Sequence, residues 1–191
     1  MNEWLNNYIE GYKKSLEAIP VDSIGNLILE FARVNKDNRQ IFVFGNGGSA
    51  SNASHFVTDM AKGASDKMQN RFKCYSLNEH MGLITAISND YSYKDIFKKQ
   101  LENLASAGDL LLTLSVSGSS PNLVEAVKWA NENGLHTIAL VGGNEGQLAE
   151  LAKELIVVDS THYGHVEDIH MLICHMIAYA FMENPDIVDS L

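Results

Sequence analysis

The chain has 191 residues, of which 46% are hydrophobic and 20% are charged, as is typical of a globular protein with a sizeable core. Its formal net charge is -10, and no stretch is rich in lysine and arginine. Binding to nucleic acid or to an anionic membrane surface needs clustered positive charge, so both are disfavoured.

The cysteines and the apolar stretches indicate the cellular compartment. Cys74 and Cys174 lie far apart in apolar stretches, which is typical of buried free thiols in a reducing environment. The sequence shows no basic segment followed by an apolar segment that would mark a signal peptide. The longest apolar stretch, residues 169–182, is interrupted by His170 and His175 and is too short to span a bilayer. We therefore expect a cytoplasmic protein.

Two helices are predicted at the start of the chain. Apolar residues recur at helical spacing from Trp4 to Leu16 and again from Ile24 to Phe31. Pro20 separates the two segments, because proline rarely continues a helix.

After residue 36, short β-branched and aromatic runs alternate with helical segments. Strands are expected at 41–44, 72–75, 110–114, 137–141 and 155–158. Helices are expected at 49–61, 92–101, 121–133 and 146–151, followed by a long final helix. This alternation predicts an α/β fold with a doubly wound, five-stranded parallel sheet. Without a linker or repeat, we expect one domain, 1–191, made of a helical pair at 1–36 and a core at 37–191.

A glycine-rich loop from Gly45 to Ser49 follows the first strand and leads into a helix. Glycines let the backbone turn tightly, and free amides at a helix start favour an anion. The loop lacks the Gly-Lys-Ser/Thr ending of a P-loop. It fits a loose dinucleotide pattern, but the nearest acid, Glu79, lies beyond the position which that pattern requires. A phosphate-binding loop is favoured, a turn without a ligand is the alternative, and no nucleotide cofactor is expected.

A serine-rich loop follows the third strand. Ser120 and Pro121 are suited to the cap and first position of the next helix. Capping needs a single serine, whereas four hydroxyls surround Gly118. Hydroxyls together with a helix N-terminus can hold the oxygens of a phosphate. The serine loop therefore predicts a phosphate site formed by Ser115, Ser117, Ser119 and Ser120.

The order of these motifs resembles the SIS (sugar isomerase) family. The resemblance rests on Phe-Gly-Asn-Gly-Gly-Ser at 44–49, His55-Phe56, Thr-Ala-Ile-Ser-Asn-Asp at 85–90, Gly108-Asp109 and the serine loop. It covers nearly the whole chain and is strongest for phosphoheptose isomerases, which interconvert sedoheptulose 7-phosphate and heptose 7-phosphate. The resemblance implies a homotetramer that uses its leading and final helices as contacts.

Two pairs of titratable residues lie on predicted helices. His55 and Asp59 are four residues apart and share a helix face, which by itself is typical of a solvated surface with a weak ion pair. The final helix is apolar on two sides, which indicates burial, here against another subunit. On that helix, a buried core histidine and a site residue are equally good interpretations of His175. Helical geometry alone would pair His175 with Asp168.

The resemblance gives these residues more specific roles. It implies that His55, Asp59, Glu167 and His175 meet in one site that holds zinc, with Asp59 as the base and His175 as its acid/base partner. It also implies substrate-binding roles for Asn46, Gly47, Ser49, Asp90 and Glu167. The sequence departs from the family at two positions, because Asp59 replaces the usual Glu and Glu167 replaces the usual Gln.

The expected function is therefore isomerisation of a heptose 7-phosphate through an enediol, in the synthesis of nucleotide-activated heptose for lipopolysaccharide or capsule. Two alternatives remain. One is an isomerase or epimerase that acts on another sugar phosphate, which the two departures allow. The other is a non-catalytic SIS protein that binds a sugar phosphate or associates with a replication initiator. Members of that type lack the acid four residues after the histidine, which this chain has at Asp59.

Overall fold

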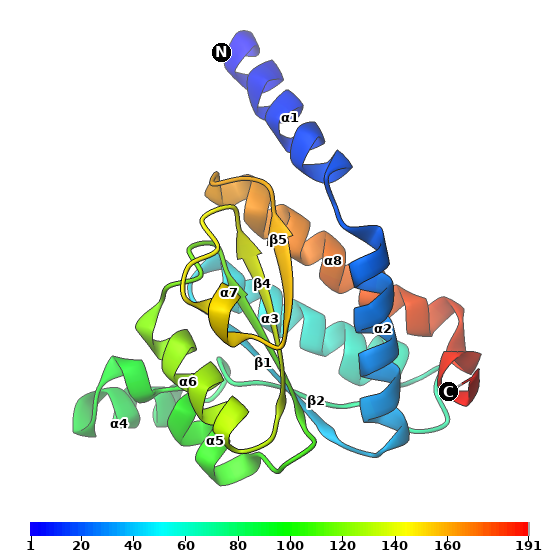
Figure 1. The fold of residues 1–191 in the computed structure, drawn as a ribbon, viewed down its shortest axis with the longest axis vertical. Coiled ribbons are helices and arrows are strands. Elements are labelled where there is room, and N and C mark those ends of the chain that lie inside the picture. The colour runs from blue at the N-terminus through cyan, green and yellow to red at the C-terminus, as the bar shows by residue number, and fades with distance from the viewer. Residues whose placement is uncertain (191) are drawn as a thin grey trace.

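A computed structural model of the protein describes residues 1–190 and shows a five-stranded parallel sheet with helices on both faces (Figure 1). The strands are β1 (Gln40–Gly45), β2 (Lys73–Ser76), β3 (Leu110–Ser115), β4 (His136–Gly142) and β5 (Glu154–Val158). Their order is β2-β1-β3-β4-β5, and every neighbouring pair is parallel. The predicted doubly wound α/β fold is confirmed, with the flavodoxin-like strand order. Leu191 lies outside the described residues.

The helices lie between the strands and at both ends of the chain. They are α1 (Asn2–Glu17), α2 (Val21–Lys36), α3 (Gly48–Thr58), α4 (Met81–Asp90), α5 (Lys98–Leu104), α6 (Pro121–Glu132), α7 (Leu148–Leu151) and α8 (Tyr163–Glu183). A π-helix (Asp59–Ala64) continues α3, and 3₁₀ turns occur at Tyr93–Asp95 and Pro185–Ser190. No helix among residues 1–190 combines the length and the apolar character that a membrane span requires.

The pleat of the strands divides the core between the two faces of the sheet. In β1, Ile41 and Val43 pack with α2, α3 and α8, whereas Phe42 and Phe44 pack with α4 to α7. Because both faces are covered, the central strands are apolar at nearly every position, which is why the sequence reveals them clearly.

The helical segments differ from the expected ones at three places. The helix expected at 49–61 changes to a π-helix at Asp59, where Gly63 leaves room for Met182 of α8. The helix expected at 92–101 is instead a 3₁₀ turn followed by α5. Helix α4 was not predicted, because its cap is the ring of His80, an unusual capping residue, and it buries a single side chain, Ile87.

His170 on α8 provides a test of this core. Its side chain is fully buried, and burial lowers the pKa of its imidazole to about 4, from an ordinary value of 6.5. Below pH 6.5 the unfolded chain takes up a proton at this histidine, while the folded chain does so only near pH 4. Stability therefore falls as the pH drops through this window, by about 3 kcal/mol in total.

We expect His170→Leu to remove this part of the pH dependence, as measured by urea unfolding at pH 7 and pH 4. The control is Ile173→Val, which changes a buried side chain without a titratable group on the same helix and should keep the wild-type slope. An unchanged slope in His170→Leu would contradict the assignment.

Candidate functional site

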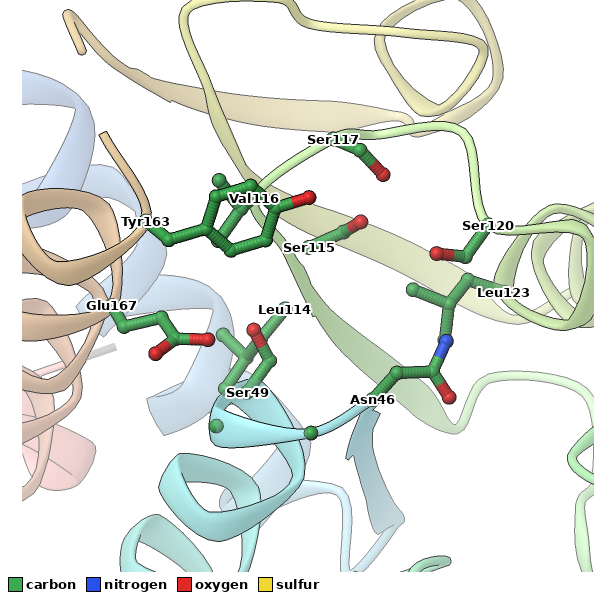
Figure 2. Close-up of a pocket in the computed structure, with 12 residues that line it drawn as sticks. Asn46, Ser49, Leu114, Ser115, Val116, Ser117, Ser120, Leu123, Tyr163 and Glu167 are labelled. Carbon is green, nitrogen blue, oxygen red and sulfur yellow. The ribbon is translucent and has the colours of Figure 1, made fainter. Parts of the chain in front are cut away.

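A pocket of about 340 Å³ opens at the carboxyl ends of β1 and β3, where the glycine loop and the serine loop meet (Figure 2). In a parallel sheet of this type, ligands bind at this edge. The lining combines backbone amides, hydroxyls and one carboxylate over an apolar floor. It consists of Asn46, Gly47, Gly48, Ser49, Leu114, Ser115, Val116, Ser117, Ser120, Leu123, Tyr163 and Glu167.

The glycine loop needs its glycines for two separate reasons. Gly47 has φ +56° and ψ -124°, a conformation that residues with a side chain rarely adopt. Gly48 leaves room for the carboxylate of Glu167, which would lie 2.3 Å from a Cβ at that position. The loop thus brings the start of α3 against α8 beside the pocket.

The serine loop turns around Gly118, which has φ +62° and packs against the carbonyl of Glu145. The hydroxyl oxygen of Ser115 accepts a hydrogen bond from the amide of Gly118 at 3.0 Å. Ser120 occupies the N-cap of α6, as predicted, yet its hydroxyl does not cap the helix. Figure 2 shows this hydroxyl and that of Ser117 directed into the pocket.

Ser119 and Asp90 do not line this pocket. Ser119 is exposed, and its hydroxyl lies beside Gly146. Asp90 is exposed at the end of α4, where its carboxylate accepts a hydrogen bond from Asn89. The structure therefore does not bring these two predicted ligands to the other pocket residues.

Asn122 and Tyr163 belong to the site but were not identified from the sequence. The side-chain amides of Asn46 and Asn122 form two reciprocal hydrogen bonds, each 2.9 Å long, which join the glycine loop to α6. Tyr163, the first residue of α8, lies over the pocket (Figure 2). Asn122 directly follows the predicted cap and first residue of a helix, which was the available signal, whereas no start was predicted for the final helix that Tyr163 begins.

Glu167 lies between the pocket and the glycine loop. Its carboxylate accepts a hydrogen bond from the backbone amide of Ser49, and burial together with nearby Asp168 raises its pKa above the ordinary value. Helix α3 is also tied to α8 because the amide of Asn52 donates to the carbonyl of Glu167 at 2.8 Å. These contacts hold the two helices side by side at the pocket.

Further along the same two helices, His55, Asp59 and His175 form a compact triangle. Nε2 of His55 and Nε2 of His175 lie 3.4 Å apart, and Oδ2 of Asp59 lies 3.5 Å and 3.6 Å from them. That oxygen is buried and has no hydrogen-bond partner among the described residues. The structure thus brings His55 and Asp59 of one predicted helix together with His175 of the final helix.

The triangle fits a divalent metal ion. Ligand atoms at zinc distances in a tetrahedron are separated by roughly 3.3 Å, close to the separations observed here. The three residues form a group whose ligand atoms all lie within 4.8 Å of one another, and Glu167 is not part of that group. A cation would also satisfy the unpartnered oxygen of Asp59.

The close approach at Gly118 predicts a strong effect of a small substitution. In Gly118→Ala the new Cβ would lie 1.7 Å from the carbonyl oxygen of Glu145, at a positive φ. We expect a loss of at least about 2 kcal/mol of stability, together with weaker binding of inorganic phosphate. Gly25→Ala is the matched control, because nothing lies within 4 Å of its Cβ and alanine favours the helix. Equal stability of the two variants, measured by urea unfolding, would contradict this account of the loop.

Comparison with known proteins agrees with this architecture. The family model described as SIS domain matches residues 6–142. The probable phosphoheptose isomerase of Thermoplasma volcanium is 35% identical over 91% of this chain and 88% of that protein. The phosphoheptose isomerase of Neisseria meningitidis is 37% identical over 72% of this chain and 71% of that protein.

Solved structures show the same relationship. The phosphoheptose isomerase GmhA from Neisseria gonorrhoeae superposes with a TM-score of 0.86 at 29% identity, over 100% of this chain and 99% of that one. The phosphoheptose isomerase from Francisella tularensis gives a TM-score of 0.84 at 26% identity, again over 100% and 99%. The chain therefore belongs to the SIS domain family, among its phosphoheptose isomerases.

Proposed function

We propose that the chain is an aldose–ketose isomerase that interconverts sedoheptulose 7-phosphate and D-glycero-D-manno-heptose 7-phosphate. The names of its relatives support this activity. The observation that carries the proposal is the arrangement of a serine-lined pocket and a His–Asp–His triangle along the same two helices. We place the activity in the cytoplasm, in the supply of heptose for nucleotide activation, and the two free buried cysteines fit a reducing compartment.

The pocket is suited to the phosphate end of the substrate. The hydroxyls of Ser117 and Ser120 point into it, and the positive end of the α6 dipole lies at the same loop. This arrangement binds a phosphate without a lysine or arginine in the lining, which agrees with the acidic character of the chain.

The triangle is suited to proton transfer at the other end of the sugar. It lies about two helical turns from the pocket along α3 and α8, or roughly 11 Å, a distance comparable to an extended sugar chain. Asp59 takes the proton from the carbon next to the carbonyl, and His175 donates a proton to the carbonyl oxygen, which gives the enediol. The reverse transfers, with the proton returned to the neighbouring carbon, complete the isomerisation.

We further propose that His55, Asp59 and His175 hold one zinc ion; Glu167, the fourth ligand that the family resemblance implies, lies at the pocket and outside this group, so water or substrate would take the fourth position. When bound, the ion would supply positive charge that stabilises a developing oxyanion. Asp59 would then have to serve both as a ligand and as the base, so these two roles compete.

A homotetramer would complete this site. The side chain of His55 is 53% exposed and that of His175 is 39% exposed, although enediol chemistry benefits from the exclusion of water. Helix α1 extends away from the sheet (Figure 1) and exposes an apolar series formed by Trp4, Leu5, Ile9 and Leu16. A second subunit that packs on α1 and α8 would bury this series.

A second candidate function is the isomerisation of a different sugar phosphate. The specific observation is the carboxylate of Glu167 in the pocket, where the family has a neutral amide. An ionised carboxylate only accepts hydrogen bonds, whereas the amide of the usual Gln can also donate one to a sugar oxygen. A panel of ketose phosphates, with aldose formation as the readout, distinguishes the two candidates.

If Asp59 and His175 transfer protons and the serine loop binds the phosphate, one set of variants should lower kcat and another should weaken substrate binding. Asp59→Asn and His175→Gln should each lower kcat at least about 100-fold and leave affinity for the sugar phosphate nearly unchanged. The double variant Ser117→Ala, Ser120→Ala should weaken binding by a few kcal/mol, since it removes hydrogen bonds to a charged group. Ser119→Ala, at an exposed serine outside the pocket, is the matched control and should behave as wild type.

Proton exchange separates an enzyme from a binding protein. Wild-type protein should exchange the carbon-bound proton of the substrate with heavy water, and Asp59→Asn should not. If wild-type protein neither isomerises a ketose phosphate nor exchanges this proton, the isomerase proposal fails and a ligand-binding role replaces it.

The assembly can be tested by sedimentation. We expect a tetramer at micromolar concentration, and Trp4→Asp with Ile9→Asp should dissociate it by placing charges in an apolar contact. Leu104→Asp is the control, because Leu104 is 50% exposed on α5 but lies outside the proposed contacts. A wild-type monomer, or dissociation by the control alone, would overturn the proposal.

A further inference from the structure

A second group of potential metal ligands lies at the opposite edge of the sheet from the pocket. Glu30 is on α2, His136 is the first residue of β4, and Glu154 is the first residue of β5. The pocket is at the carboxyl ends of the strands, whereas these residues are at the amino ends. The two places are thus separated by about the length of a six-residue strand, roughly 20 Å.

The pleat of the sheet explains why the three residues meet. In β4, Ile138 and Leu140 face α2, α3 and α8. His136 lies two residues before Ile138, so its side chain faces the same side of the sheet. In β5 the same argument applies to Glu154, which precedes buried Ile156 by two residues. Both side chains therefore point from the sheet toward α2.

The three side chains approach one another closely enough to share an ion. One ligand atom from each lies within 4.8 Å of the other two. Nε2 of His136 is 2.5 Å from Oε1 of Glu154. The side chains are partly buried, with exposed fractions of 32% for His136 and 27% for Glu154. A pocket of about 180 Å³ adjoins Glu154, and neither Glu30 nor His136 lines it, so it gives water access to one side of the group.

The charges of the group favour a cation. Glu30 and Glu154 bring two carboxylates together, and they repel each other unless positive charge lies between them. Arg33 forms an ion pair with one oxygen of Glu30. Lys153, next to Glu154 in the sequence, instead donates to the carbonyl of Leu135. The group thus carries a net negative charge when the ring of His136 is neutral.

We propose that Glu30, His136 and Glu154 form a second metal site, which binds a divalent transition-metal ion such as zinc and fastens α2 to the amino ends of β4 and β5. One imidazole and two carboxylates are ligand types that zinc accepts, with water in the remaining position. On binding, the His136–Glu154 contact opens from 2.5 Å to roughly 3.3 Å, the separation of two ligands in a zinc tetrahedron.

The site is structural, because it lies away from the substrate pocket and joins the N-terminal helical pair to the core. A ligand that binds the folded chain and not the unfolded chain raises the melting temperature. Zinc at this site therefore adds a metal-dependent contribution to the packing of α2, which already buries Ile24, Leu27 and Phe31, and it does so independently of the His55–Asp59–His175 triangle.

The experiment uses untagged full-length protein in two backgrounds. In the double variant His55→Ala, His175→Ala the triangle has lost both imidazoles. Equilibrium dialysis against micromolar zinc, followed by elemental analysis, should leave one ion per chain in this variant. Adding His136→Ala should remove that ion, whereas adding His80→Ala, which changes an exposed histidine, should not.

Milder variants guard against a loss of folding in His136→Ala. Glu30→Gln and Glu154→Gln should each weaken zinc binding at least about 10-fold and leave the circular dichroism unchanged. Glu125→Gln is the matched control, because Glu125 also pairs with a basic residue three positions later, Lys128, but lies outside the group. With cobalt in place of zinc, the visible absorption of a His-ligated ion should appear and should depend on His136.

The melting temperature gives a second readout. Saturating zinc should raise it by about 5 °C in the double variant and leave it unchanged when His136→Ala is added. Equal zinc content with and without His136→Ala, or equal affinity in Glu30→Gln and Glu125→Gln, would overturn the proposal. Isomerase activity of His136→Ala should equal that of wild type at low temperature, because the site does not touch the pocket.

Discussion

The adjacency of β1 and β3 is the constraint on which the rest of the site depends. In the order β2-β1-β3-β4-β5, the chain crosses from one side of β1 to the other, so the loops that follow β1 and β3 diverge to opposite faces and leave a crevice between them. The glycine loop leads into α3 on one face, and the serine loop leads into α6 on the other. The reciprocal amide pair of Asn46 and Asn122 bridges the crevice and fixes its width.

The seam between α3 and α8 extends this crevice into a site with two ends. Both helices begin beside the pocket and run in the same direction, because Ser49 lies near Glu167 and His55 lies near His175. Small residues at Gly48 and Gly63 let the segment from α3 through the π-helix approach α8 closely. The pocket and the triangle therefore lie at the two ends of one seam between α3 and α8, and the serine loop closes the pocket end from the other face of the sheet.

The parts of the fold that local patterns determine were predicted well. Each strand end lies within one residue of its expected position, and the signal is clearest for β1, β3 and β4, whose apolar runs are covered on both faces. The cap of α6 at Ser120 also followed from local rules. Helix α4 was missed because its capping residue is a histidine and little of it is buried.

The features that depend on contacts across the sheet could not be predicted in the same way. The pairing of Asn46 with Asn122 joins residues 76 positions apart, and the glycine motif that contains Asn46 does not indicate its partner. The triangle of His55, Asp59 and His175 was anticipated from family resemblance, because helical spacing alone explains His55 with Asp59 and leaves His175 as a core residue. The group of Glu30, His136 and Glu154 arises only when α2 packs beside the start of two strands.

The shorter acid at Asp59 is compatible with this geometry. Asp59 is the first residue of the π-helix, where the backbone widens beside α8, and its Oδ2 is almost equally distant from the two imidazoles. π-Helical turns are frequent at functional sites because they reposition a side chain without breaking the helix. The carboxylate thus reaches both histidines without the additional methylene of the usual Glu.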